Sequence, residues 1–283
     1  MAIYISTGGF FKISAAKAIE KLYKTGIKDI ELSGGKYEPN LLKQIEKYRK
    51  LNLKVHNYFP PPKKPFVLNF ASLDKNIYEK SENLVLKAIN FSKKIKSNYY
   101  SFHAGFLCDI TPNDLGKNVK KKKLNSRKIC TELFIDRVKK ISKVAKNSGV
   151  KLMIENNVIT KNNLLEFGEN PFLMSEPKET KKILNLLPDN VGMLLDVAHL
   201  KVSAKTLGFN RSEMFLKCKN KIFGYHLSEN NGNRDSNEAF DQNSWFWKFI
   251  PKESEYVSIE VYENQAKKLF NLLKLAKNKL SIN

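Results

Sequence analysis

Short apolar runs alternate with longer amphipathic segments along the whole chain. Most of these runs end at glycine, proline or a polar residue, as strands that are covered on both faces do. The clearest is Val191–Leu195, VGMLL, an unbroken apolar run of strand length. The pattern predicts strands at residues 2–7, 29–33, 53–58, 99–103, 151–155, 191–195, 222–227 and 256–261.

Helical periodicity fills most of the intervals between these strands. One predicted helix begins near Ser175, which can cap its N-terminus, with Pro177 in the first turn. The pattern predicts further helices at residues 14–23, 39–51, 81–95, 126–147, 211–219, 245–249 and 263–280. Strands that alternate with helices in this way indicate parallel pairing and right-handed crossovers.

Eight such units in 283 residues have the size of a closed (β/α)8 barrel, or TIM barrel. We therefore expect a single α/β domain over residues 1–283. A doubly wound open sheet is the alternative architecture. The glycine-rich phosphate turn that often marks such a sheet is missing, because Gly8-Gly9 lacks the required spacing.

The net charge of +22 is the feature that would suggest a nucleic-acid partner. Only five of the 50 basic residues are arginine, however, and nucleic-acid surfaces favour the bidentate arginine fork. Lysine is spread over all the predicted helices, so we expect the charge to promote solubility rather than nucleic-acid binding. The basic loop at residues 117–128 has two interpretations, a solvated loop or a surface that holds a phosphate.

The sequence shows no feature that directs the protein to a membrane or out of the cell. No apolar stretch has the length of a membrane span, and the first residues do not form a signal-peptide pattern. The three cysteines, Cys108, Cys130 and Cys218, have no paired spacing, which fits a reducing compartment. We therefore expect a cytoplasmic protein with no membrane partner.

Metal-binding and acid–base side chains stand at the ends of the predicted strands. They are His56, His103, Glu155, Asp196, His226 and Glu260, with His199 just beyond Asp196. In a barrel the carboxyl ends of the strands converge on one face, where active sites are built. Carboxylates and imidazoles together favour a divalent transition metal, Mn, Zn, Co or Fe, over Ca. A single glutamate at a strand end, such as Glu31, is more typical of a helix cap or a surface partner.

Four motifs resemble those of the xylose-isomerase-like TIM-barrel superfamily. They are GIKDIELSGG, LMIENN, LLDVAHLKVS and GYHLSENNGNRDSN, and the resemblance extends over essentially the whole chain. The last motif is the most specific, because it is similar to the family pattern His-x-Ser-Asp-Asn-x-Gly-x-Arg-Asp-Ser-His. The family contains sugar isomerases, ketose 3-epimerases, inosose dehydratases and zinc-dependent abasic-site endonucleases.

The resemblance implies a metal site together with its neighbours. The residues that match the four ligands of the family's shared metal, one divalent Mn, Zn, Co or Mg ion, are Glu155, Asp196, His226 and Glu260. His199 matches a histidine that contacts substrate in the epimerases and a further zinc ion in the endonucleases. The other candidates for substrate binding or for a second metal ion are His103, His56, Asp235 and Arg234.

One position departs from the family pattern. Asn237 stands where the family has the histidine of an Asp-x-His pair that begins here at Asp235. An amide is a poor zinc ligand beside imidazole. The departure argues against a trinuclear zinc site and against the DNA-repair branch of the family. His56 and His103 could still bind a second metal ion.

The resemblance therefore implies a metal-dependent isomerase or epimerase of a sugar or sugar phosphate. Proton transfer would pass through a metal-stabilised enediolate, with Glu155 and Glu260 as the two acid–base groups. The alternatives are an abasic-site endonuclease-like phosphodiesterase and a sugar dehydratase that uses the same site. The expected partner is a small sugar, and members of the family often pair as homodimers through the outer helices of the barrel.

Overall fold

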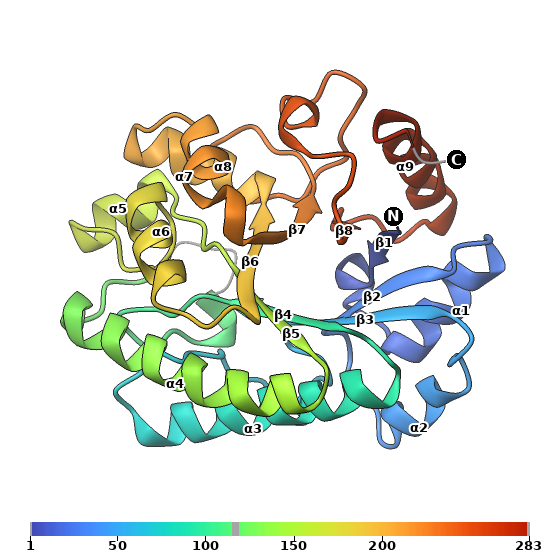
Figure 1. Cartoon of the computed structure of the whole chain (residues 1–283), viewed down its shortest axis with the longest axis horizontal. Coiled ribbons are helices and arrows are strands. Elements are labelled where there is room, and N and C mark those ends of the chain that lie inside the picture. Colours follow the sequence, from blue (N-terminus) through green and yellow to red (C-terminus); the bar gives the residue numbers. More distant parts are fainter. Residues whose placement is uncertain (1, 115–118, 282–283) are drawn as a thin grey trace.

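Eight parallel strands close into a barrel that is surrounded by helices (Figure 1). The computed structural model describes residues 2–114 and 119–281. The strands are β1 Ile3–Ser6, β2 Asp29–Ser33, β3 Asn52–His56, β4 Tyr99–His103, β5 Lys151–Glu155, β6 Val191–Asp196, β7 Ile222–Leu227 and β8 Val257–Ile259. Strands adjacent in sequence pair in order, and β8 pairs with β1 to complete the ring. The predicted TIM barrel is confirmed, and the open sheet is excluded.

The helices pack on the outside of the strands (Figure 1). Those in the described residues are α1 Ala15–Lys24, α2 Leu41–Glu46, α3 Lys75–Lys94, α4 Arg127–Asn147, α5 Lys161–Phe167, α6 Pro177–Asn185, α7 Val197–Leu207, α8 Ser212–Cys218 and α9 Ala266–Lys279. The two longest, α3 and α4, lie side by side along one flank, and α9 contacts β1 where the ring closes.

Two of these helices, α5 and α7, are not predicted by the hydrophobic pattern. α7 follows β6 without a loop, so the apolar positions of the strand and the helix form one run with no visible boundary. α5 is short, and only Asn163 and Phe167 of it are buried, so it has no apolar stripe of helical period. Two predicted helices are shorter than expected, since residues 39–51 contain only α2 and residues 245–249 contain only a 3-10 turn.

Alternation along each strand separates the outer core from the interior of the barrel. Leu152 and Ile154 of β5 belong to the main core between the strands and the helices. Their neighbour Met153 belongs to a separate buried cluster inside the barrel, to which β1, β4, β6 and the residue before β8 also contribute. In this cluster the ring of Tyr4 stacks on that of Tyr256, with ring centroids 5.1 Å apart. Side chains therefore fill this end of the barrel, which is a packed core rather than a pore.

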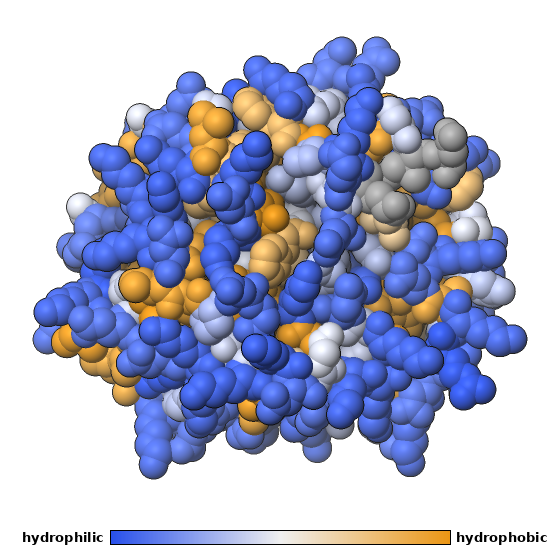
Figure 2. Space-filling model, viewed as in Figure 1, coloured by the Kyte–Doolittle hydropathy of each residue, from blue (hydrophilic) through white to orange (hydrophobic). Residues whose placement is uncertain are grey.

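Polar and charged side chains cover most of the face shown in Figure 2, with small apolar patches between them. None of the helices within the described residues combines the length and the apolar character of a membrane span.

Gly105 follows β4 at a point where the chain passes close to buried Ala71. A Cβ atom at Gly105 would lie 2.5 Å from the Cβ and 3.1 Å from the backbone nitrogen of Ala71. We expect Gly105→Ala to lower the free energy of unfolding by about 1–3 kcal/mol, the usual cost of overpacking, in urea denaturation. Adding Ala71→Gly removes the closer contact, so the double variant should lose less than the sum of the two single changes. Simple additivity would contradict this account.

Candidate functional site

The same alternation places polar groups at the carboxyl end of the barrel. In β5 the inward positions are Met153 and then Glu155, the last residue of the strand. The residues that approach Glu155 from other strands are His56 of β3, His103 of β4 and His226 of β7. The predicted convergence of side chains from separate strands is therefore present in the structure.

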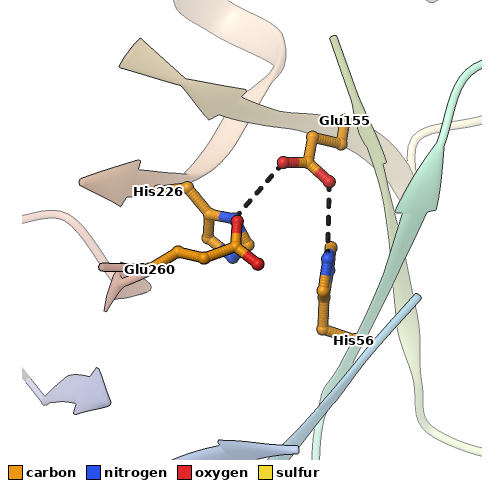
Figure 3. Close-up of side chains that lie close together, drawn as sticks. All are labelled: His56, Glu155, His226 and Glu260. Carbon is orange, nitrogen blue, oxygen red and sulfur yellow. Dashed lines mark hydrogen bonds and ion pairs between the residues drawn. The ribbon is translucent and has the colours of Figure 1, made fainter. Parts of the chain in front are cut away.

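Glu155, His226 and Glu260 form the centre of this cluster (Figure 3). The Nδ1 atom of His226 lies 2.9 Å from Oε2 of Glu260 and 3.3 Å from Oε1 of Glu155. The same nitrogen lies 3.9 Å from Oδ2 of Asp196. All four side chains are buried. The four residues that the family resemblance implies as metal ligands thus meet around one nitrogen atom.

His56 lies beside this centre (Figure 3) and contacts a side chain of β4. Its Nε2 atom lies 3.5 Å from Oε2 of Glu155, and its Nδ1 atom lies 2.9 Å from the hydroxyl oxygen of Ser101. The ligand atoms of His56, Glu155, His226 and Glu260 all lie within 4.8 Å of one another. The Ser101 contact orients the imidazole, as hydrogen-bond partners of metal-binding histidines do.

The Asp-x-x-His spacing of Asp196 and His199 has a local structural cause. Asp196 ends β6 and caps α7, because its Oδ1 atom accepts the backbone N–H of His199 at 2.7 Å. The backbone N–H of Asp196 donates to Oδ1 of Asn156 at 2.8 Å. One carboxylate oxygen is therefore occupied by the helix cap, and the other faces His226.

His199 belongs to the neighbouring part of the site. Its Nδ1 atom lies 2.9 Å from the backbone oxygen of Asn156, and its Nε2 atom lies 3.1 Å from Oδ2 of Asp235. A second group of potential ligand atoms, from His103, Glu155 and His199, also lies within 4.8 Å. They include residues that the family resemblance implies for substrate binding or for a second metal ion.

The segment after β7 borders this second position. Asp235 contacts His199, while Arg234 is exposed and lines the cavity above the site. Asn237 is buried, and its Nδ2 atom donates to the backbone oxygen of Glu260 at 3.1 Å. Where the family pattern has an imidazole, this chain has an amide that ties the segment to the end of β8.

Three carboxylate oxygens of the four candidate metal ligands have no hydrogen-bond partner among the described residues. They are both oxygens of Glu155 and Oδ2 of Asp196. The nearest nitrogen to Glu155 Oε1 is Nδ1 of His226, which lies closer to Glu260. Buried oxygens of this kind cost free energy unless something satisfies them. The carboxylate and imidazole groups of this cluster could therefore hold a divalent metal ion.

Burial and the facing imidazoles together shift the pKa values of the carboxyl groups in different net directions. Burial raises the pKa of Asp196 to about 7, since the nearby His199 imidazole offsets only part of the effect. It also raises the pKa of Glu260, against the influence of His226. Glu155 differs, because three facing imidazoles, first that of His103, outweigh burial and hold its pKa well below the usual range.

The histidines show the matching contrast. Burial lowers the pKa of His103 to about 4, despite the Glu155 carboxylate. Burial acts in the same direction on His226, but the carboxylates of Glu31, Glu260 and Glu155 raise its pKa well above the usual range. The carboxylates around His226 therefore favour the protonated form of its imidazole.

Glu31 is the site residue that the sequence reasoning misses. The sequence predicts a cap or a surface partner, but the residue is fully buried in β2. Its Oε2 atom lies 2.8 Å from Nε2 of His226 and accepts the hydroxyl of Tyr256. The signal lies in the strand period, because Ile30 and Leu32 both pack in the outer core and so turn Glu31 inward.

A cavity of about 750 Å³ opens above these residues. His56, His103, His199 and Glu260 lie at its base, and its walls include the aromatic residues Phe11, Tyr58, Phe106, Phe172 and Tyr262. A cavity of this size with apolar walls and a few converging polar groups is typical of a small-molecule site.

The basic loop predicted at residues 117–128 also borders the cavity. Residues 117–118 lie outside the described part of the chain. Val119 lines the cavity, whereas the Nζ atom of Lys122 donates to the backbone oxygen of Asp109 at 2.7 Å. The described part of the loop therefore contributes a wall to the site.

Comparison with known proteins adds a family and a fold. The family model described as xylose isomerase-like TIM barrel matches residues 18–265. A search of curated proteins finds no match. The solved structure of a D-tagatose 3-epimerase-like protein aligns with a TM-score of 0.74 and 20% identity, over 100% of this chain and 98% of that chain.

Two further solved structures have the same fold. A D-psicose 3-epimerase with D-tagatose, from Clostridium cellulolyticum H10, aligns with a TM-score of 0.65 and 15% identity, over 99% of this chain and 97% of that one. A protein from Thermus thermophilus, soaked with ZnCl2, aligns with a TM-score of 0.64 and 18% identity, over 98% and 99% of the two chains. Identities this low show a shared fold alone. The family model covers most of the sequence, including β2 to β8, so the chain belongs to the xylose isomerase-like TIM barrel family.

Proposed function

We propose that this protein is a metal-dependent isomerase or epimerase of a sugar or sugar phosphate. The observation that carries the proposal is the pair of buried carboxylates, Glu155 and Glu260, around His226 at the base of the cavity. The partnerless oxygens of Glu155 and Asp196 support a divalent metal there. The two epimerase structures that share the fold support the substrate class.

Both reactions remove a proton from a carbon next to a carbonyl group and return one. A divalent metal held by Glu155, Asp196, His226 and Glu260 would supply Lewis-acid polarisation of that carbonyl. Glu155 and Glu260 reach the site from β5 and from the end of β8, so their carboxylates approach a bound carbon from different sides. One carboxylate can accept the proton and the other can deliver one, which is what epimerisation requires.

The neighbouring residues are suited to hold the rest of the sugar. His199 and Asp235 form a fixed polar pair, and His103 lies next to them at the base of the cavity. Arg234 is the cation at the rim, where it can meet a hydroxyl or a phosphate. Aromatic walls can pack against the carbon-bound hydrogens of the substrate.

Deuterium exchange tests the proposal directly. We expect protein loaded with Mn²⁺, Co²⁺, Zn²⁺ or Mg²⁺ to introduce solvent deuterium at one carbon of a substrate drawn from a panel of ketoses, aldoses and their phosphates, as followed by NMR. Chelation should stop the exchange, and added metal should restore it, because the carbonyl polarisation depends on the ion. If no compound in the panel exchanges a carbon-bound proton with any of these metals, the proposal fails.

One observation favours a second candidate function, an abasic-site endonuclease-like phosphodiesterase. The group formed by His103, Glu155 and His199 could hold an additional ion. Elemental analysis separates the two functions. One ion per chain supports the isomerase or epimerase, whereas three zinc ions per chain together with nicking of abasic DNA would support the phosphodiesterase.

A further inference from the structure

We propose that Glu31 is a positioning residue that commits His226 to bind the metal through its Nδ1 atom, with Tyr256 holding Glu31 in place. The inference rests on the metal site of the proposed function, but not on the reaction that the site performs. It assigns a role to a buried carboxylate that belongs to no predicted ligand set.

The first step is the geometry of the His226 ring. Its Nε2 atom lies 2.8 Å from Oε2 of Glu31, and its Nδ1 atom faces Glu260 at 2.9 Å. An ionised carboxylate can only accept a hydrogen bond, so the nitrogen that faces Glu31 carries a hydrogen. Glu260 faces Nδ1 in the same way, but Glu260 is itself a candidate metal ligand. A metal ion can therefore replace the hydrogen on Nδ1 while Nε2 stays bonded to Glu31.

The second step is the position of Nδ1 among the other ligands. It lies within 3.3 Å of a Glu155 oxygen and 3.9 Å from the partnerless oxygen of Asp196. No such convergence exists at Nε2, whose ion-pair partner within the described residues is Glu31. The carboxylates thus surround the side of the ring that Glu31 leaves open.

The third step is the cost of burying Glu31. The residue is fully buried, and the ion pairs among the described residues give it neither a lysine nor an arginine partner. Burial of a carboxylate costs free energy unless nearby polar or charged groups offset it. Its partners are His226 and the Tyr256 hydroxyl, so its burial has a structural rationale in the orientation of the imidazole.

The fourth step is the rigidity of the support. Glu31 lies in the middle of β2, paired with Ser6 of β1 and Lys54 of β3. Tyr256, the residue before β8, stacks on Tyr4 of β1. Carboxylates on rigid elements that bind the second nitrogen of a metal-binding histidine fix its tautomer and raise its basicity.

Metal affinity tests the inference in the full-length protein. We expect Glu31→Gln to weaken Mn²⁺ or Zn²⁺ binding by about 10- to 100-fold in competition with a chelator, since losses of this size follow changes to such partners. Tyr256→Phe keeps the carboxylate and should weaken binding less. The matched control is Asp29→Asn at the start of the same strand, where the carboxylate bonds Asn52 instead of the site, and it should leave affinity unchanged.

The tautomer of His226 distinguishes this role from a purely structural one, because a Glu31 that only stabilised the fold would not determine which ring nitrogen carries the hydrogen. In the Zn²⁺-loaded wild type, ¹⁵N NMR should show a hydrogen on Nε2 and none on Nδ1, and Glu31→Gln should make this signal heterogeneous or broader. A hydrogen on Nδ1, or an unchanged affinity in folded Glu31→Gln, overturns the inference. If that variant does not fold, the wild-type tautomer and the affinity of Tyr256→Phe decide the question. Metal binding that depends on Glu31 without sugar exchange would refute the proposed function and leave this inference standing.

Discussion

Glu155→Gln should reduce deuterium exchange into the substrate by about 10²–10⁴ in kcat/KM, the contribution typical of a positioned acid–base group. The amide keeps the size of the side chain but removes the charge that three imidazoles face. It also replaces one of two partnerless carboxylate oxygens by a nitrogen that cannot bind a metal. We therefore expect weaker metal binding as well, and the exchange rate should be measured at saturating metal.

The control for this variant is Glu79→Gln on the outer helix α3, which removes an exposed carboxylate paired with Lys75. It should leave exchange unchanged. Circular dichroism should show that Glu155→Gln keeps its fold, because the side chain lies at the end of a strand whose outward residues form the core. Exchange within tenfold of wild type at saturating metal would exclude Glu155 from proton transfer.

Asp196→Asn should stabilise the metal-free protein at neutral pH while it weakens metal binding. Burial raises the pKa of Asp196 from 3.8 to about 7. The folded chain therefore holds a proton that the unfolded chain has lost between about pH 4 and pH 7, so the wild type loses stability as pH rises through this range. The variant lacks this loss, and its advantage should grow to a few kcal/mol near pH 7.

The helix cap should survive in Asp196→Asn, because an asparagine oxygen can still accept the backbone N–H of His199. Urea denaturation from pH 4 to 7 measures the advantage in the absence of metal. Added Mn²⁺ should raise the melting temperature of the wild type more than that of the variant, since ligand binding stabilises only a competent site. Asp189→Asn, at an exposed carboxylate paired with Lys221, is the control and should follow the wild type. If the free energy of unfolding of Asp196→Asn changed with pH in the same way as that of the wild type, the raised pKa of Asp196 would be contradicted.

Much of the site could be predicted because it depends on local patterns. The run LMIE in β5 predicts a strand whose alternate residues face opposite sides, and this places Glu155 at the inward end. The same reasoning places His56, His103 and His226 at strand ends. A ring of parallel strands gathers such ends on one face without any detail of packing.

The boundary between β6 and α7 shows where local patterns fail. Strand and helix are both buried there, so the hydrophobic pattern runs through Asp196 without a break. Its second role, as the cap of α7, depends on the chain turning into a helix at once. The sequence predicts Asp196 as a carboxylate at a strand end. It does not predict that one of its oxygens caps α7 while the other faces His226.

The sequence by itself determined the barrel, the strand ends and the set of candidate ligands, because strand period and element order are local properties. The tertiary structure decided which atoms face one another. Glu31 and His226 are separated by 195 positions, yet their hydrogen bond selects the ring nitrogen left for a metal. The tertiary structure likewise decides the role of Asn237, whose amide donates a hydrogen bond to the backbone oxygen of Glu260. The Glu31–His226 pairing arises from the closure of the ring, which brings strands that are far apart in the sequence within bonding distance and which no local pattern encodes.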